Sequence, residues 1–298
     1  MSTVEVVSTV EVVRAGALTT VQDRGRAGLA HLGVPPSGAL DERAFALANR
    51  LLGNPADAAA LETTLDGVAL RPDRDCRIAV TGAPAAVSVD GHPAAWGAVV
   101  DVPAGARLEV GTAGAGLRSY VAVAGGVCTE EVLGSRSHDL LSGLGRGPLR
   151  TGDRLPLGDA QGAHPAAVDV APQPAPPTEL QLTLWDGPRR GRLTERGAAT
   201  LRSATWTVAP ASNRIGLRLE GPALELACDE ELRSEGVVTG AVQVPPDGRP
   251  LIFLRDHPTT GGYPVIGVVD PAELSACAQA RPGIPVRFHP RSVAWAAG

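Results

Sequence analysis

The sequence predicts a mainly β protein with a few short helices, organised as two β-rich lobes. Short runs of alternating or wholly apolar residues dominate both halves, and Gly, Pro or Asp-Gly turns end most of them. The length of 298 residues suits one large domain or two of ordinary size. An Ala- and Pro-rich stretch at 160–178 is typical of an exposed linker. We therefore predict lobes at 1–159 and 179–298.

The first regular element that the pattern predicts is a helix in the N-terminal lobe. In "LDERAFALANRLL" (40–52) the apolar residues at 40, 44, 47, 48, 51 and 52 form one helical stripe. Ser37 is a plausible start signal, and "GNP" at 53–55 is a stop signal. A second, short helix is expected at 270–280, with Asp270 as cap, Pro271 at its first position and Glu273 closing a capping box.

The remaining apolar runs have the length of strands and end at turn residues, and they do not alternate with helices as in βαβ units. This pattern favours a barrel or a sandwich. In the N-terminal lobe they are 76–82, 85–91, 97–103, 106–111 and 116–126. In the C-terminal lobe they are 179–185, 204–210, 216–221, 250–255, 263–269 and 284–288.

Composition argues against several classes of function. The net charge is -5 and no basic run occurs, so neither nucleic acid nor an anionic membrane is an expected partner. No segment approaches the roughly 20 apolar residues of a membrane span, and the N-terminus lacks the basic region of a signal peptide. The four Cys residues are far apart, which disfavours a disulfide framework or zinc site and makes the cytoplasm the default compartment.

The chain contains no Lys at all, because all 27 basic residues are Arg. A lysine-bound biotin, a Schiff-base lysine and a P-loop lysine are therefore excluded on this chain. A bound phosphate would have to be held by Arg or by backbone amides.

Two polar segments of the N-terminal lobe could bind an anion. The stretch 19–54 is Gly-rich before its helix, where free N–H groups could bind an anion, although capping and turn formation explain the same residues. In "VLGSRSHDLLSGLGRG" (132–147), Ser135, Arg136 and Ser137 suit a phosphate or carboxylate, or a solvated loop.

The C-terminal lobe carries the densest group of reactive side chains, "RDHPTTGGYPVIG" (255–267). Asp256 could set the tautomer and charge of His257, as a general base requires. However, neighbouring residues on a strand point to opposite faces, so the two side chains need not touch, and a polar turn remains the alternative. Further polar candidates in this lobe are Asn213, Arg214, Glu235, Gln243, Asp247, Thr259, Thr260 and Tyr263.

Taken together, these segments resemble one family. The motifs occur in the order "TTVQDRGRAGLAHLGVPPSGALDERAFALANRLLGN", "YVAVAGG", "LGSRSHDLLSGLG", "SNRIGLRLEGP", "SEGVVTGAVQVPPDGRPL" and "DHPTTGGYPVIG". The sequence resembles the biotin-dependent carboxyltransferase/allophanate-hydrolase-subunit-2 family, whose bacterial members include KipA-like proteins, from about residue 10 to 289.

The resemblance implies a fold, partners and cofactors. It implies two β-rich lobes with cyclophilin-like barrel character, and two partner proteins, the KipI-like B subunit together with the LamB/YcsF-like A subunit. It implies the ATP-dependent opening of 5-oxo-L-proline to L-glutamate, with ATP and Mg²⁺ bound on this chain, on the B subunit or at the interface between them. The family also includes the carboxyltransferase part of urea carboxylase, which would need biotin on a separate chain, and regulatory partners of KipI-like proteins without catalysis.

The implied lactam chemistry suggests roles for the polar candidates. Donors for phosphate and for the substrate carboxylate would be Arg26, Arg136 and Arg214. An acid or base would be His257, Asp256 or Glu235. Asp23 or Asp247 could hold Mg²⁺ with ATP.

Overall fold

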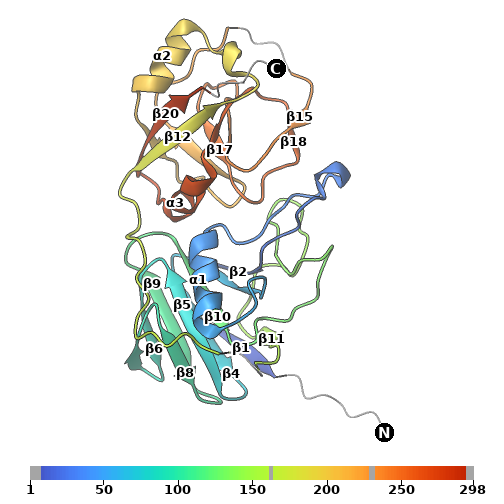
Figure 1. Ribbon diagram of the computed structural model, residues 1–298, viewed down its shortest axis with the longest axis vertical. Helices are drawn as coiled ribbons and strands as arrows, with labels where there is room; N and C mark the ends of the chain where they lie inside the picture. Colours follow the sequence, from blue (N-terminus) through green and yellow to red (C-terminus); the bar gives the residue numbers. More distant parts are fainter. Residues whose placement is uncertain (1–7, 161–163, 228–231, 293–298) are drawn as a thin grey trace. The chain divides into compact units, whose positions relative to one another are not determined.

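The computed structural model describes residues 8–160, 164–227 and 232–292. Contacts divide the chain into two compact units. Unit 1 comprises Met1–Arg26, Asp41–Asp139 and Gly143–Pro176, and unit 2 comprises Ala27–Leu40, Leu140–Ser142 and Pro177–Gly298. Both units are built mainly of strands, which confirms the predicted fold class (Figure 1).

Unit 1 is a sandwich of two antiparallel sheets. The six-stranded sheet has the order β11-β1-β4-β9-β6-β7, and the five-stranded sheet has the order β2-β3-β10-β5-β8. The strands of the first sheet are β1 Thr9–Arg14, β4 Val68–Pro72, β6 Ala85–Val89, β7 His92–Ala94, β9 Leu108–Ala113 and β11 Arg154–Pro156. Those of the second are β2 Leu18–Gln22, β3 Ala60–Thr64, β5 Cys76–Gly82, β8 Val99–Val102 and β10 Arg118–Val123.

The core of unit 1 lies between these sheets because their inward-facing positions are aliphatic. Val10 and Leu108 from the first sheet belong to the same buried cluster as Ile78 and Val121 from the second. The other face of the second sheet is covered by α1 (Glu42–Leu52), which packs on β5 and β10 (Figure 1).

Unit 2 is a closed barrel with the strand order β12-β19-β16-β17-β14-β13-β20. The barrel closes where β12 pairs in parallel with β20. Its strands are β12 Leu180–Asp186, β13 Trp206–Val208, β14 Gly216–Glu220, β16 Ala241–Gln243, β17 Leu251–Phe253, β19 Val265–Val269 and β20 Pro285–Arg291. The expected barrel character is thus present in this unit.

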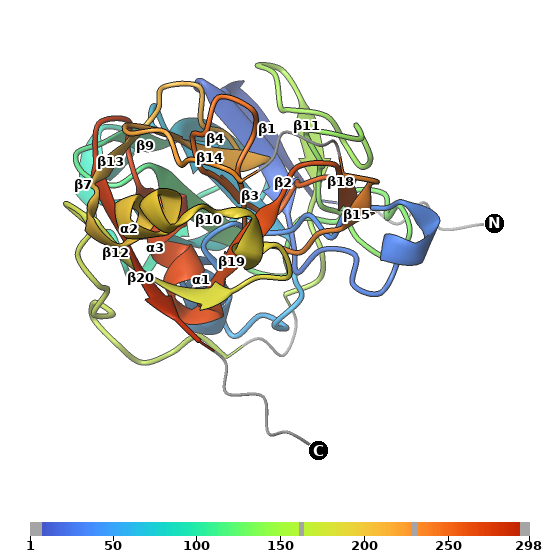
Figure 2. The ribbon, with the colours of Figure 1, turned by 90° about the horizontal axis from the view of Figure 1, so that it is seen from above.

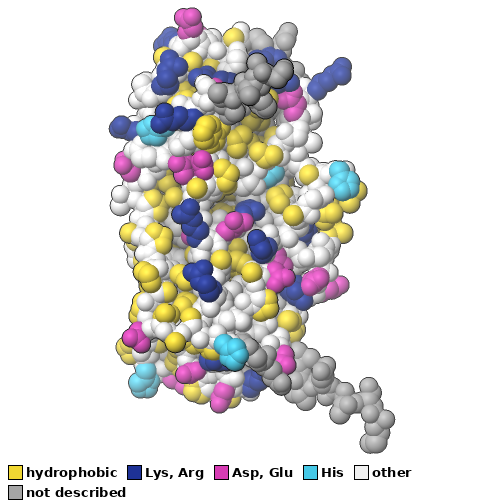
Figure 3. Space-filling model, viewed as in Figure 1, with side chains coloured by type: hydrophobic (Ala, Val, Ile, Leu, Met, Phe, Trp, Pro, Cys, Tyr) yellow, Lys and Arg dark blue, Asp and Glu magenta, His cyan; other side chains and the backbone are white. Residues whose placement is uncertain are grey.

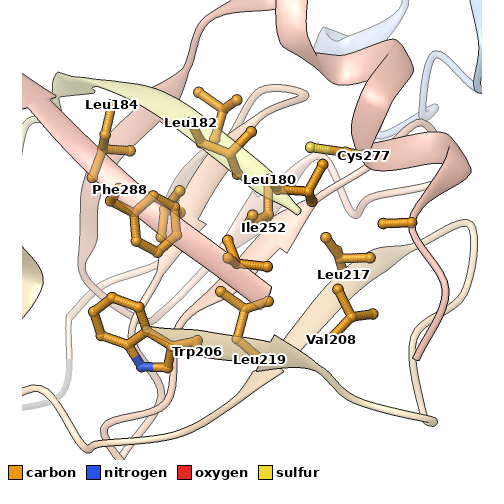
Figure 4. Close-up of a cluster of buried hydrophobic side chains, with 14 of the residues drawn as sticks. Leu180, Leu182, Leu184, Trp206, Val208, Leu217, Leu219, Ile252, Cys277 and Phe288 are labelled. Atoms are coloured by element: carbon orange, nitrogen blue, oxygen red, sulfur yellow. The ribbon is translucent and has the colours of Figure 1, made fainter. Parts of the chain in front are cut away.

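Large apolar side chains fill the barrel (Figure 4). Trp206 and Phe288 are buried with their ring centroids 5.5 Å apart, and Leu180, Leu182 and Leu219 belong to the same cluster. With few aromatic residues in the chain, aliphatic side chains provide most of this core.

Short elements surround the barrel. The two-stranded sheet of β15 (Glu235–Gly236) and β18 (Thr260–Gly261) is seen side by side in Figure 2. The other elements are α2 Glu195–Ser203, α3 Leu274–Gln279 and the 3₁₀ turns η1 Ala30–Leu32, η2 Arg190–Arg192 and η3 Pro271–Glu273. Within the described ranges, no helix is long and apolar enough to span a membrane.

The predicted start of α1 is wrong. The helix begins at Glu42, and its cap is Asp41, whose carboxylate accepts a hydrogen bond from Ala44 N at 3.1 Å. Ser37 lies in the left-handed region at φ 51° and donates its hydroxyl hydrogen to Asp256 instead. Asp41 occupies the N–H of Ala44 and places a negative charge at the helix start, which disfavours a bound anion there. The stop at Gly53, with φ 70°, is confirmed.

The predicted capping box near 270 is also wrong. Asp270 caps the short turn by accepting from Ala272 N at 2.9 Å, as expected. Glu273 instead accepts hydrogen bonds from the backbone N–H and the hydroxyl of Thr183 on β12. A tertiary partner has therefore replaced the local one.

Every predicted strand run contains a strand, but several elements were missed. The missed elements are α2 and the strands β1–β4, β7, β11, β15, β16 and β18. The missed strands β15, β16 and β18 have two or three residues each, too few to show a period. The missed helix α2 begins after Thr194, whose hydroxyl oxygen caps it by accepting a hydrogen bond from the N–H of Gly197.

The stretch predicted as an exposed linker packs against unit 1 where it is described. Ala166 N donates to Leu51 O, Ala171 N donates to Gly97 O, and Gln173 accepts from Gly82 N. Residues 161–163 of the predicted linker lie outside the described residues. The predicted lobe boundaries stay a prediction.

Replacing Phe288 by Ala should destabilise unit 2 by about 3–5 kcal/mol, because it removes a buried ring from the barrel core. Chemical denaturation followed by intrinsic Trp fluorescence measures this change. Val170→Ala, at an exposed position, is the matched control and should change stability by less than about 0.5 kcal/mol. Equal effects of the two substitutions would contradict the assigned core.

Candidate functional site

Asp23, predicted to hold Mg²⁺, is the centre of a buried hydrogen-bond network in unit 1. Its carboxylate accepts from the hydroxyls of Ser135 and Ser137, both at 2.6 Å. It also accepts from the backbone N–H groups of Gly25 and Arg136. Because four donors already occupy its two oxygens, Asp23 fixes the loop around 135–137 and has little capacity left for a cation.

The arginines predicted beside it bind their own chain. Buried Arg26 donates to the carbonyl oxygens of Val132 and Ser137 at 2.8 and 2.6 Å. Arg136 donates to Thr129 O and forms an ion pair with Glu131 at 2.7 Å. These side chains hold the loop in shape, so their predicted role as anion ligands is not supported by the geometry and stays a prediction.

A second buried polar network in unit 1 was missed. Tyr120 on β10 donates to Glu62 on β3 at 2.7 Å and accepts from Asp41 N at 2.7 Å. Arg118 Nε lies 3.6 Å from the same Glu62 carboxylate. Burial, together with the negative charges of Glu62 and Asp41, raises the pKa of Tyr120 well above its ordinary value. The phenol therefore stays protonated and joins the start of α1 to the sheet.

In unit 2, Asp256 and Arg214 form a fully buried ion pair. The Nε–Oδ2 and Nη2–Oδ1 distances are 2.8 and 3.0 Å, and the Arg214 and Asp256 side chains are 1% and 0% exposed. Asp256 also accepts from the hydroxyl of Ser37 and from Leu140 N, while Arg214 donates to Gly38 O. With these partners Asp256 is not placed to act as a general base, and Arg214 is not available to a substrate.

His257 follows directly but has different surroundings. Its Nδ1 lies 2.6 Å from Pro258 O, and its ring centroid is 5.7 Å from that of Phe253. This geometry favours the tautomer with hydrogen on Nδ1, which places the lone pair on Nε2. His257 is thereby oriented by a carbonyl oxygen, not by the predicted Asp256 carboxylate.

Two other predicted residues have local roles. Asn213 Oδ1 accepts from Ile215 N at 2.8 Å, which is a turn-forming contact. Asp247 is exposed and accepts from Arg249 N at 3.0 Å. Among the described residues, no group of three or more His, Cys, Asp or Glu side chains is arranged to hold a metal ion.

Most of the remaining predicted residues lie in or beside the β15–β18 sheet, which approaches β16 at Gln243. Gln243 donates to Tyr263 O at 3.0 Å, and a methyl group at Gly261 would stand 2.5 Å from Gln243 Nε2. Glu235 pairs with Gly261 in the sheet, and Thr260 pairs with Gly236. Thr259 O accepts from Val237 N. We call Gln243, Glu235, Tyr263 and Thr260, together with His257 beside the ring of Phe253, the barrel-end cluster.

Arg189 joins this cluster and was missed. It forms a bidentate ion pair with Glu235, with Arg189 Nε 3.1 Å from Glu235 Oε2. Its backbone N–H donates to Val265 O on β19, which pairs with Gln243. Hydrogen bonding and the positive charge of Arg189 lower the pKa of Glu235, so this carboxylate stays ionised at neutral pH. No local motif around Arg189 indicated a partner 46 residues away.

The barrel-end cluster contains both buried and exposed polar side chains. Its apolar floor is Val237, Ala241, Phe253 and Val265. Gln243 and His257 are buried, whereas Tyr263 is exposed and Glu235 is partly exposed. An apolar cluster with a few polar groups beside it is typical of a small-molecule site. This cluster is the candidate site.

A cleft of about 580 Å³ in unit 1 contains none of the predicted site residues. Arg74, Asp75, Arg77, Asp101 and Asp159 line it, so its charges are mixed. Burial raises the pKa of its Cys76 to about 11, which leaves no thiolate at neutral pH. Basic and acidic side chains are also interspersed on the face shown in Figure 3.

Comparison with known proteins decides the family. The model for "Carboxyltransferase domain, subdomain A and B" matches residues 32–290. The chain belongs to this carboxyltransferase-domain family. It is 37% identical to the 5-oxoprolinase C subunit of Escherichia coli (strain K12), over 93% of the chain and 90% of that protein. It is 34% identical to urea amidolyase of Lachancea kluyveri, covering 95% of the chain but 17% of that protein.

Solved structures of this family share the fold. The structure of TTHA0988 superposes with a TM-score of 0.86 at 35% identity, over 97% of this chain. The chain spans 57% of the length of that protein. Urea amidolyase of K. lactis superposes with a TM-score of 0.84 at 31% identity, and the chain spans 19% of it.

Replacing Arg214 by Met should destabilise unit 2 by about 3–5 kcal/mol, because it leaves the buried Asp256 carboxylate without its cation. The double substitution of Arg214→Met and Asp256→Leu should be less destabilising than Arg214→Met alone, since it removes both charges. Urea denaturation of the wild type, Arg214→Met, Asp256→Leu and the double variant measures the coupling. An additive result would contradict a direct buried ion pair.

The Glu235 carboxyl should titrate below the range of an unpaired Glu, and Arg189→Gln should raise its midpoint. Because folding lowers this pKa, the pair contributes stability above the pKa of Glu in the unfolded chain and loses it as pH falls through the folded-state pKa. Carbon-detected NMR titration of the side-chain carboxyls measures the midpoint. Arg190→Gln, whose partner is Asp186, should leave the midpoint unchanged.

Proposed function

We propose that this chain acts as the C subunit of an ATP-dependent 5-oxoprolinase, which opens 5-oxo-L-proline to L-glutamate. The supporting observation is the match to the 5-oxoprolinase C subunit of E. coli, which covers 93% of this chain and 90% of that protein. The same relationship extends to Haemophilus influenzae at 33% identity. The proposed partners are the LamB/YcsF-like A subunit together with the KipI-like B subunit in the cytoplasm.

The barrel-end cluster suits a small lactam. The ring of 5-oxo-L-proline has one amide and a short apolar edge, which match the Gln243 side chain and the apolar floor. Attack of water on the amide carbon needs a base, and the candidates are the ionised Glu235 and the oriented His257. Thr260 and Tyr263 provide hydroxyl groups on the accessible side.

ATP would supply a phosphoryl group to the amide oxygen, which would make the amide carbon more electrophilic toward water; the bond that breaks to open the ring is the C–N bond, and phosphate would be released on hydrolysis. Neither acid predicted for Mg²⁺ fits that role among the described residues: Asp23 already accepts four hydrogen bonds, and Asp247 is a single carboxylate at an exposed turn. We propose that Mg²⁺ and ATP are held mainly by another protein of the complex. That leaves lactam recognition and proton transfer to this chain.

Carboxyl transfer to urea or a related amide is the second candidate. It is favoured by the family model and by the urea amidolyase and urea carboxylase relatives. Without Lys, the chain has no attachment point for biotin, so a carboxylated biotin would come from another protein. A planar amide is also the common feature of urea and the lactam, so the same cluster would serve both substrates.

The complex of this chain with its A and B partners should release glutamate and ADP from 5-oxo-L-proline and ATP. His257→Gln should lower kcat by about 100-fold, since general acid–base groups typically contribute that much. His31→Gln, at an exposed position in η1, is the matched control and should keep wild-type turnover. Coupled assays of glutamate and ADP measure both products.

A correctly assembled complex that yields no glutamate would contradict the oxoprolinase function. Biotin-dependent carboxylation of urea by the same complex, supplied with a carboxylated biotin carrier, would establish the transferase instead. Full turnover by His257→Gln would remove that residue from the site without affecting the proposed reaction.

A further inference from the structure

Two Arg–carboxylate pairs of unit 2 differ in their exposure. The Arg214 and Asp256 side chains are 1% and 0% exposed, whereas those of Arg189 and Glu235 are 40% and 31% exposed. Water screens an exposed pair of this kind, so breaking it costs little, while a buried pair is costly to break. The Arg189 guanidinium can therefore exchange its carboxylate partner at little cost, and that of Arg214 cannot.

The elements that carry Arg189 and Glu235 place them beside Gln243. Arg189 is tied through its N–H to Val265 O, and Val265 pairs with Gln243 across β16 and β19. Glu235 is on β15, opposite Gly261, which in turn lies against the Gln243 side chain. The pair thus stands next to the amide group that we assign to lactam recognition.

A 5-oxo-L-proline molecule carries a carboxylate one bond from its lactam ring, in addition to the amide. A guanidinium binds a carboxylate through two parallel hydrogen bonds, which is the geometry that Glu235 already adopts with Arg189. The two hydrogen bonds by which Arg189 binds Glu235 in the free protein are therefore the bonds that would bind the substrate carboxylate.

We propose that Arg189 is the residue that binds the substrate carboxylate, and that Glu235 occupies this position until the substrate displaces it. This inference rests on the proposed function. Arg26, Arg136 and Arg214, which the sequence suggested for this role, donate to groups of their own chain. Arg190, next in sequence, pairs with Asp186 instead.

Competition between Glu235 and the substrate has a distinctive consequence. Removing the Arg189 guanidinium removes the binding group, whereas removing the Glu235 charge removes its competitor. The two substitutions should therefore shift substrate affinity in opposite directions. A merely structural ion pair would give shifts in the same direction, because either substitution breaks the same contact.

Isothermal titration of the assembled complex with 5-oxo-L-proline, without ATP, tests the proposal. Arg189→Gln should raise Kd by about tenfold to a hundredfold, the loss expected for a charged hydrogen-bonded pair. Arg189→Lys should give a smaller increase, because it keeps the charge but loses the fork geometry. Glu235→Gln should lower Kd.

Two controls separate the carboxylate from the rest of the site. Binding of 2-pyrrolidone, the same lactam without a carboxylate, should be unchanged by Arg189→Gln. Arg190→Gln should leave the Kd of 5-oxo-L-proline at the wild-type value. Circular dichroism of each variant shows that the barrel remains folded.

The possible outcomes distinguish this inference from the proposed function. If the wild-type complex binds 5-oxo-L-proline and Arg189→Gln binds it equally well, Arg189 is not the carboxylate ligand, and the oxoprolinase function stands. Weaker binding by both Arg189→Gln and Glu235→Gln would also overturn the exchange. If the wild-type complex binds no 5-oxo-L-proline, the proposed function fails, and this inference fails with it.

Discussion

The buried ion pair between Arg214 and Asp256 is the interaction on which the polar part of unit 2 depends. Moving two charges out of water costs several kcal/mol for each ion, so the pair is stable only when further hydrogen bonds complete its coordination. Asp256 accepts them from Ser37 and Leu140, which are 219 and 116 positions away in the sequence. Arg214 donates to Gly38, which is 176 positions away. The charges thereby determine where the segments Ala27–Leu40 and Leu140–Ser142 lie in unit 2.

In unit 1, buried charged side chains are likewise stabilised by hydrogen bonds from the same chain, although the bonding groups differ. Asp23 is surrounded by two hydroxyls and two backbone N–H groups, and Arg26 by carbonyl oxygens of the same loop. Each buried charge is satisfied by its own chain, which is the condition for stability at low dielectric. A side chain bonded in this way gives shape to a loop and has little hydrogen-bonding capacity left for a ligand.

The barrel-end cluster is different because its charges are accessible and its ion pair can exchange. Function in this family cannot be assigned from the fold, since the 5-oxoprolinase C subunit of E. coli shares it with urea amidolyase. The two candidate substrates, 5-oxo-L-proline and urea, both present a planar amide. A site with the amide of Gln243, the ionised Glu235 and the oriented His257 suits either of them. Discrimination between them must then come from groups that recognise the rest of the substrate, such as a carboxylate ligand.

The sequence by itself determined the strand-forming runs, the end of α1 at Gly53 and the family resemblance, because these depend on local patterns and on the order of motifs. Tertiary structure decided which charged residues are architectural. Asp256 and His257 are neighbours in sequence, yet one binds Arg214 and the other Pro258 O. Arg189 and Glu235 meet across 46 residues, and Glu62 and Tyr120 across 58. Local periodicity indicates which face of a helix or strand a side chain occupies. It does not indicate the partner of that side chain, since burial and pairing are properties of the folded chain.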